Sequence, residues 1–234
     1  MPLFLKRRDK NSKERMDDPD CDKQELFNTY DQFSVINSLI SRWQFIYKNF
    51  IKNACSDPTK TYTLLDIGFG GGDLPIKISK WAKNDRLKLD VTAIETDSRA
   101  TEYVQGIETP PEITFRQISS TDLIKEGQTF DFVISNHLLH HLSDDELLRM
   151  LQEARKLSNR RVLFNDIERS DLGYLVFNLL SRPIFRSSFI TEDGLTSIKR
   201  SFTAEELEEK VPADWIVKRI FPYRLLLSYD HEKS

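Results

Sequence analysis

Residues 64–73 read Leu-Leu-Asp-Ile-Gly-Phe-Gly-Gly-Gly-Asp, and this stretch decides the fold. It closes a short apolar run that begins at Tyr62, and it precedes a segment of helical spacing from Leu74 to Trp81. Four of the chain's eight glycines lie within five positions here, and glycine adopts backbone angles that other residues avoid. The pattern predicts a strand, a tight loop and a helix. In open α/β sheets, ligands bind at such loops, beyond the carboxyl ends of the strands.

The rest of the chain alternates in the same way, which is typical of a parallel sheet with helices on both faces. Two β-rich runs end the chain, and only Pro222 separates them, so they must pair antiparallel. The sequence therefore predicts an α/β, Rossmann-like, mostly parallel seven-stranded sheet with an antiparallel C-terminal strand. The strands are expected at 62–67, 89–94, 113–115, 130–135, 162–164, 215–221 and 223–229, and the principal helices at 74–81, 99–104 and 144–157.

Two regions lie outside this alternation. Residues 1–56 are expected to form a charged arm followed by a helical lid, because apolar residues recur at helical spacing from Gln24 to Ile51. Residues 57–234 are expected to form the main domain. Within it, residues 170–212 are rich in aromatic and basic side chains and are predicted to be an insertion that covers the substrate.

Composition excludes several classes of protein. The net charge of -3 gives no cationic field of the kind that attracts nucleic acid. Cys21 and Cys55 are too few for a disulfide scaffold and are expected to be thiols in a reducing compartment. The apolar start of the chain is too short for a signal peptide, and no stretch has the length of a membrane span. We therefore expect a cytoplasmic protein without a nucleic-acid partner or a membrane span.

Carboxylates around the glycine loop indicate the charge of its ligand. Asp66 precedes the loop, and Asp73 stands where a dinucleotide-binding loop has its third glycine. These carboxylates would repel a pyrophosphate and attract a cation. Glu95 ends the next strand, where an acid can accept both hydroxyls of a ribose, whereas Asp97 is expected to cap the following helix. An adenosine with a cationic tail satisfies both observations.

These residues resemble the class I S-adenosylmethionine-dependent methyltransferases. Residues 64–73 are similar to the family's first motif, Glu95 falls on its ribose-binding acid, and residues 130–135 with 139–142 (Leu-His-His-Leu) are similar to its fourth-strand region. Segments outside the core resemble a bacterial subgroup whose substrates are mostly unassigned. Some relatives of that subgroup are similar to quinone-biosynthesis or polyketide-tailoring enzymes.

The resemblance implies S-adenosylmethionine as the cofactor and a set of residues that bind it. Where the family has an acid for the adenine amino group, this chain has Ser119, and Asp122 is the other candidate for that contact. The residues expected to bind the cofactor are Asp66, Gly68, Phe69, Gly70, Gly72, Glu95, Thr96, Ser119 and Asn136.

Three of the chain's four histidines lie beside the expected position of the methyl group. A phenol or enol acceptor gains from a base, and histidine suits that role near neutral pH. We predict His140 as the base and His137 as the alternative, with His141 in a structural hydrogen bond. The competing interpretation is that all three support the loop while proximity and desolvation perform the catalysis.

The acceptor is expected to be a small aromatic, quinol-like or polyketide-like molecule that is methylated at oxygen. Asp166, Arg169 and Tyr174 are the predicted substrate residues, and Phe177, Phe185 and Phe189 are candidates for the pocket walls. No metal is expected, because Asn136, Asn165 and Asp166 offer Mg²⁺ too few carboxylates. The alternative function is a catalytically idle module that binds S-adenosylmethionine or a partner protein, and the N-terminal helices allow a homodimer.

Overall fold

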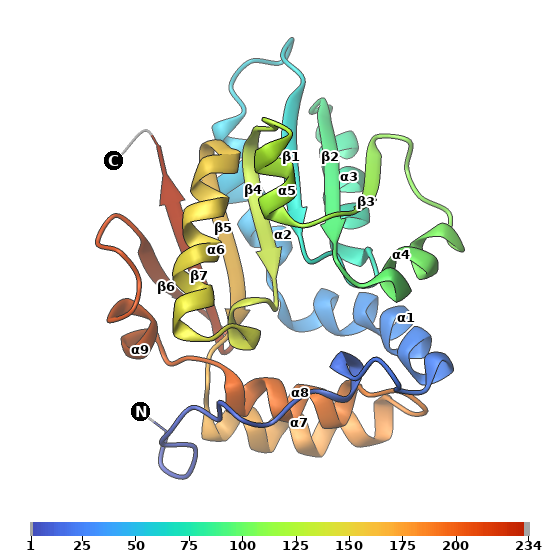
Figure 1. The fold of residues 1–234 in the computed structure, drawn as a ribbon, viewed down its shortest axis with the longest axis vertical. Helices are drawn as coiled ribbons and strands as arrows, with labels where there is room; N and C mark the ends of the chain where they lie inside the picture. The colour runs from blue at the N-terminus through green and yellow to red at the C-terminus, as the bar shows by residue number, and fades with distance from the viewer. Residues whose placement is uncertain (1, 232–234) are drawn as a thin grey trace.

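The computed structural model describes residues 2–231, and within that range seven strands form one sheet in the order β3-β2-β1-β4-β5-β7-β6. The strands from β1 to β5 are parallel, and β7 runs antiparallel between β5 and β6 (Figure 1). The bounds are β1 Tyr62–Ile67, β2 Leu89–Glu95, β3 Ile113–Gln117, β4 Phe130–Asn136, β5 Ser158–Ile167, β6 Ile216–Ile220 and β7 Arg224–Asp230.

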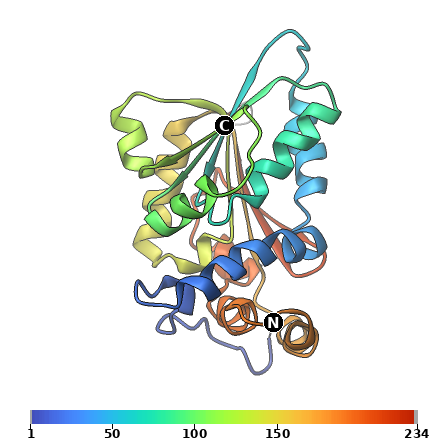
Figure 2. The same cartoon turned by 90° about the vertical axis from the view of Figure 1, so that its right-hand side faces the viewer.

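Helices cover both faces of the sheet, and a further group lies across one end (Figure 2). The longer ones are α1 Lys23–Ile40, α3 Asp73–Asn84, α4 Ser98–Gln105, α6 Asp144–Leu157, α7 Asp171–Ile184 and α8 Ile190–Arg200. The shorter ones are α2 Trp43–Ile46, which continues into a π-helical turn at Tyr47–Ile51, α5 Ser120–Lys125, α9 Ala204–Glu208, and the 3-10 turns Arg15–Asp17, Lys52–Ala54 and Leu139–His141.

The strand residues alternate between two apolar layers. Leu65 and Val133 pack on the side of α5, α6 and α9. Leu64 and Phe132, one position away on the same strands, pack on the side of α2 and α3. Because successive strand residues point to opposite faces, continuous apolar strands are what a sheet covered on both sides requires.

The N-terminal arm, which comprises the described residues before α1 (2–22), packs against the carboxyl edge of the sheet and against α8. The Asp193 carboxylate accepts the backbone N–H groups of Arg15 and Met16 at 2.7 and 3.0 Å. Further toward the start of the chain, the N–H of Asp9 donates to the carbonyl of Lys199 at 3.0 Å. Arm, α1, α7 and α8 together cover the end of the sheet at which the parallel strands stop (Figure 1).

The predicted fold class is confirmed, and the differences lie in the length of individual elements. β5 begins at Ser158, four residues before the expected start, because the polar run from Asn159 to Arg161 continues along β4 and β7. The segment expected to be an insertion folds into α7, α8 and α9. In the part of the chain that the structure describes, no helix has the length and hydrophobicity needed to cross a membrane.

Candidate active site

The glycine loop between β1 and α3 adopts a backbone that only glycine takes without strain. Gly68, Gly70 and Gly72 have φ angles of 81°, 51° and 73°. Gly71 serves a different purpose, because a Cβ at this position would lie 2.9 Å from the Cβ of Tyr30 on α1. The loop is therefore shaped by its own backbone and by the close approach of the N-terminal helix.

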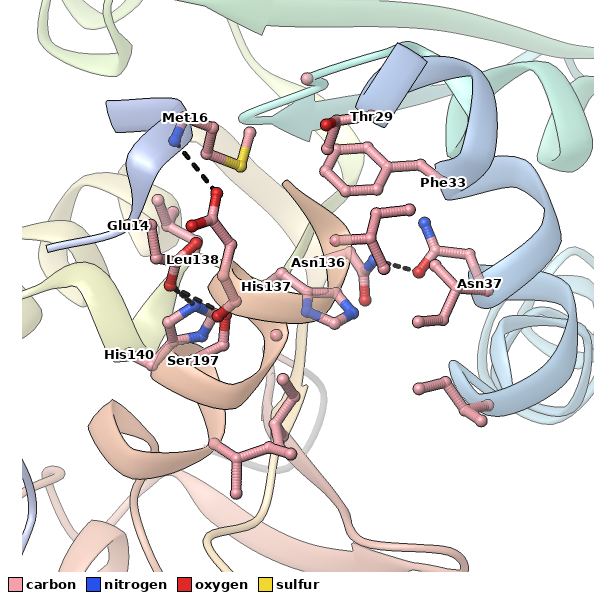
Figure 3. Close-up of a pocket in the computed structure, with 18 of the residues that line it drawn as sticks. Glu14, Met16, Thr29, Phe33, Asn37, Asn136, His137, Leu138, His140 and Ser197 are labelled. Carbon is pink, nitrogen blue, oxygen red and sulfur yellow. Dashed lines mark hydrogen bonds and ion pairs between the residues drawn. The ribbon is translucent and has the colours of Figure 1, made fainter. Parts of the chain in front are cut away.

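A cavity of about 660 Å³ lies between this loop, the ends of the strands and the covering helices (Figure 3). Its walls come from the arm, α1, the carboxyl ends of β1, β2 and β4, α7, α8 and the start of β7. Of the residues predicted to bind the cofactor or to act as a base, those that line it are Asp66, Gly68, Phe69, Gly70, Glu95, Thr96, Asn136, His137 and His140.

Asp66 lies at the floor of the cavity without a hydrogen-bond partner for either carboxylate oxygen, although its side chain is buried. Burial raises the pKa of this carboxyl well above its usual range, and the nearby charges of Asp73 and Glu95 act in the same direction. A cationic ligand would supply both the missing partner and the missing countercharge. This orphaned carboxyl is what the site of an ammonium group requires.

Glu95 is held at the end of β2 by backbone N–H groups. Its Oε1 accepts from Thr96 at 2.7 Å and from Asp97 at 3.3 Å, and its Oε2 faces the N–H of Gly70 at 3.4 Å. The side chain is half-buried and lines the cavity, so it retains acceptor capacity toward a ligand. The position fits a pair of ribose hydroxyls.

Asp97 caps α4 as predicted, and it also anchors the arm indirectly. Its side chain accepts the N–H of Arg99 and pairs with the Arg99 guanidinium at 2.6 Å. That guanidinium donates to the carbonyls of Met16 and Asp18 at 3.0 and 2.8 Å. The arm is thereby fixed beside the strand end that carries Glu95.

His140 lies between two carboxylates and is almost completely buried, with 1% of its surface exposed. Its Nδ1 is 2.7 Å from Oδ1 of Asp166, and its Nε2 is 3.2 Å from Oε1 of Glu14 on the arm. Burial alone would lower the pKa of this imidazole, but the charge and hydrogen bond of Asp166, together with Glu14, raise it to about 9. His140 is therefore an imidazolium near neutral pH, and the prediction of a general base at this position is not supported.

His141 completes this cluster as a partly exposed neighbour. Its Nδ1 lies 3.3 Å from Asp17 and its Nε2 lies 3.7 Å from Glu14. The ligand atoms of Glu14, His140 and His141 lie within 4.8 Å of one another, a spacing that could also hold a metal ion. We interpret the cluster as ion pairs, because both ring nitrogens of His140 already face carboxylates.

His137 has a different environment from its two neighbours, although all three follow β4. It adopts a left-handed backbone with φ of 61°, and its N–H donates to the carbonyl of Asn165 at 3.0 Å. Its Nε2 lies 3.2 Å from Nη1 of Arg224. Because arginine can only donate, this nitrogen is unprotonated, and a neutral imidazole then carries its proton on Nδ1. Burial and the Arg224 charge lower the pKa of His137 well below its usual value, which keeps the ring neutral.

Arg224 is 1% exposed, and no carboxylate of the described residues pairs with it directly. Its guanidinium donates to the side-chain oxygens of Asn136 and Asn165 at 3.0 and 3.3 Å as well as to His137. Burial lowers the pKa of this group to about 10, so it remains a cation. Since the amide oxygens of Asn136 and Asn165 already accept from this cation, they are poorly placed to bind Mg²⁺.

Asn136 connects this cation to the cofactor side of the cavity. Its Nδ2 donates to Oδ1 of Asn37 at 3.4 Å, and Asn37 in turn donates to both oxygens of Asp73 at 3.1 and 3.2 Å. Figure 3 shows the Asn37–Asn136 pair on one side of His137 and the Glu14–His140 pair on the other. His137 therefore lies between the two polar groups of the cavity.

Comparisons with known proteins bear on the family of the central part of the chain. The family model described as a methyltransferase domain matches residues 64–160, which include the glycine loop, Glu95 and the three histidines. The chain contains a class I S-adenosylmethionine-dependent methyltransferase domain. S-adenosylmethionine is its cofactor, and Asp66 and Glu95 have the chemistry to receive the ammonium and the ribose.

Solved structures share the fold of this methyltransferase at low sequence identity. The plantazolicin methyltransferase BpumL, in complex with a triazolic desmethylPZN analogue and SAH, is 15% identical with a TM-score of 0.60, and the match covers 92% of each chain. Human N-acetylserotonin methyltransferase in complex with SAM is 12% identical with a TM-score of 0.63, covering 89% of this chain and 56% of that one. No curated protein matches the sequence.

Several predicted site residues of the methyltransferase do not line the cavity. Ser119 caps α5 through the N–H of Asp122, and its Oγ lies 2.6 Å from the Asp122 carboxylate, so these two adenine candidates bind each other. Gly72 lies beneath the loop, where a Cβ would meet Val104 at 3.0 Å.

Two predicted substrate residues contact the N-terminal arm instead of the cavity. Arg169 is buried, pairs with Glu206 at 2.5 Å and donates to the carbonyl of Leu5 at 2.9 Å. Tyr174 packs edge-on against Phe4 at 6.1 Å between ring centroids. Arg169 and Tyr174 are therefore not assigned to substrate binding. Asp166, the third predicted substrate residue, instead orients the imidazole of His140. Phe177 and Phe185 line the cavity as predicted, whereas Phe189 packs in the core beneath α1.

The sequence did not indicate Glu14 or Arg224 as site residues. Glu14 lies in a run of charged arm residues, where a single buried carboxylate has no distinguishing pattern. Arg224 begins an otherwise apolar strand, and a cation at the first position of a strand is more often exposed. One feature of the sequence could have indicated Arg224. It directly follows Pro222 and Tyr223 at the start of an antiparallel strand, and such a start lies at the same edge of the sheet as the carboxyl ends of the parallel strands.

Proposed function

We propose that this methyltransferase transfers a methyl group to an oxygen atom of a small aromatic, quinol-like or polyketide-like acceptor. The observation that carries the proposal is the composition of the cavity beyond the cofactor end, where apolar and aromatic side chains predominate and the neutral His137 and the buried cation Arg224 lie among the polar residues. Flat apolar molecules with one ionisable hydroxyl match such walls. The apolar and aromatic lining residues are Ile36, Leu39, Ile40, Val176, Phe177, Leu180, Ile184, Phe185, Ile198 and Tyr223.

The acceptor oxygen is proposed to bind beside His137. Because Arg224 holds Nε2 of His137, the ring offers a donor from Nδ1, and such a donor stabilises a phenolate or enolate oxygen. The adjacent guanidinium favours the ionised acceptor by its charge, as a cation lowers the pKa of a nearby acid. Neither His137 nor His140 is then a base, and the acceptor loses its proton to water before or during binding.

The cofactor supplies an electrophilic methyl group, and the chain supplies alignment and a dry site. Asp66 and Glu95 are proposed to fix the two ends of the cofactor, while α7 and α8 cover the acceptor, which is the role predicted for residues 170–212. Methyl transfer is an in-line displacement, so restricting the two reactants to one geometry provides much of the rate increase.

Mass spectrometry of methylated product tests the proposal. The purified protein would be incubated with S-adenosylmethionine and a panel containing 2-naphthol, 1-hydroxy-2-naphthoate, 2-naphthylamine and 2-naphthalenethiol. We expect O-methyl products, with rates that rise with pH as the acceptor hydroxyl ionises. Methylation of the amine or thiol alone would contradict the assignment to oxygen. Tight cofactor binding without any product from wider phenol and enol libraries would favour the idle module.

A further inference from the structure

Helix α7 presents an apolar surface to solvent. Of its fourteen residues, Ser181 is the buried one, whereas Leu172, Leu175 and Leu179 are 59%, 54% and 74% exposed. Val176, Leu180 and Ile184 are exposed as well. A water-facing helix normally has polar residues on this side, and large exposed apolar patches mark interaction sites. We call these six side chains the α7 face.

The α7 face is continuous with the mouth of the active-site cavity. Val176, Leu180 and Ile184 are exposed and also line the cavity, as does Leu39 on α1, which is 66% exposed. Hydrogen bonds join the segment after α7 to α1: Asn28 donates to the carbonyl of Ser187 at 2.8 Å, and Gln32 donates to that of Arg186 at 3.2 Å. Figure 2 shows α7 and α8 beyond α1 at this end of the molecule. Whatever covers the α7 face therefore also faces the route to the acceptor site.

The charged side chains at the C-terminal end of α7 are positive. Arg182 near the end of α7 and Arg186 after it are exposed, and within residues 2–231 neither of them forms an ion pair. Asp171, the acid of α7, is occupied by the backbone N–H groups of Leu3, Phe4 and Leu5. An apolar helix face flanked by unpaired arginines has the composition of helices that lie in the interface of an anionic bilayer.

We propose that the α7 face binds the surface of a lipid bilayer that contains anionic headgroups. The leucines enter the interface, Arg182 and Arg186 lie at the level of the headgroups, and the cavity mouth opens toward the bilayer. An acceptor dissolved in the bilayer then reaches the cavity without crossing water. The surface interaction does not depend on which atom of the acceptor is methylated.

Co-sedimentation with vesicles tests this proposal without any turnover. The protein would be mixed with vesicles of phosphatidylcholine and phosphatidylglycerol at 3:1, and with phosphatidylcholine alone. We expect binding to the mixed vesicles that weakens with salt, and a loss of at least about tenfold in affinity for the double variant Leu175→Glu/Leu179→Glu. Neither leucine lines the cavity, so cofactor affinity and melting temperature should stay unchanged.

Matched controls separate this face from other exposed apolar residues. Leu148→Glu on α6 and Ile216→Glu on β6 alter side chains that are 39% and 47% exposed, and both variants should bind vesicles like the wild type. Equal binding by the double variant and the wild type would overturn the proposal. An absence of vesicle binding would overturn it too, and a dimer, seen by light scattering, that Leu175→Glu/Leu179→Glu dissociates would then assign the face to a second copy of the chain.

Discussion

The two ends of the cavity are built in different ways. At the cofactor end, the glycine loop, Asp66 and Glu95 come from residues 66–95, and backbone groups set their positions. At the acceptor end, the polar side chains come from the arm, β4, β5 and β7, which are separated by up to about two hundred residues. The cofactor end is therefore a local structure, whereas the acceptor end exists only after the whole chain has folded. Changes at one end should leave the other largely intact, and four experiments test this separation.

The largest effect is expected from His140→Ala at the acceptor end. Removing the imidazolium leaves the buried carboxylates of Asp166 and Glu14 without their countercharge, which should reduce the free energy of unfolding by about 3–5 kcal/mol. Urea denaturation measures the change, with His141→Ala as the control because that ring is 25% exposed. A loss below about 1 kcal/mol for His140→Ala would mean that the two carboxylates find other partners.

The pH dependence of stability tests whether His140 is charged between Asp166 and Glu14. Because the folded protein raises the pKa of His140 from 6.5 to about 9, the stabilisation from its protonated form is complete below pH 6.5 and disappears as the pH rises through 9. Asp166 and Glu14 behave oppositely: their pKa values are lowered in the fold, so their contribution disappears in acid. We expect the melting temperature to fall between pH 6.5 and 9.5 in the wild type. His140→Gln should flatten this part of the curve, and an unchanged slope would place the responsible group elsewhere.

Glu95→Ala acts at the cofactor end and should weaken the binding of S-adenosylmethionine by about 1–3 kcal/mol, because hydrogen bonds to a charged group are lost. Calorimetry would show a dissociation constant higher by roughly 5- to 150-fold. Glu102→Ala, which removes an exposed partner of Lys23 on the neighbouring helix, is the control. If Glu95→Ala bound the cofactor normally, the ribose would have to lie elsewhere.

Ser119→Ala is expected to have the smallest effect. The variant loses the cap of α5 and should be less stable by about 1 kcal/mol, while cofactor affinity changes little because the hydroxyl already binds Asp122. Ser119→Asp is the companion variant, since it keeps a capping oxygen. A clear loss of cofactor affinity in Ser119→Ala would restore the adenine contact that the sequence suggested.

The same difference between local and distant contacts decides what could be predicted from the sequence. The strand before Gly68, the acid at Glu95 and the cap at Asp97 follow from neighbours within a few residues, and the structure places all three as expected. Glu14 and Arg224 became visible only through partners more than fifty residues away. Arg169 shows the converse error, because an arginine among aromatic residues suggested a pocket while its partner Glu206 lay 37 residues ahead.

The three histidines show how one short motif divides into separate roles. They lie within the five residues that follow β4, and a single helical turn would have given them similar surroundings. Instead, the left-handed backbone at His137 turns that ring toward Arg224, while the 3-10 turn Leu139–His141 directs His140 toward Asp166 and Glu14. One ring is thereby kept neutral and the next is kept charged. Residue type alone predicts neither state.

The long-range contacts of the arm also affect the order in which the chain folds during translation. Glu14 is translated early, yet its partner His140 and the Asp193 carboxylate that receives the neighbouring backbone emerge from the ribosome about 125 to 180 residues later. The nascent arm must therefore wait for these partners until the residues between them have been translated. The arm is therefore translated before the residues that complete its native contacts.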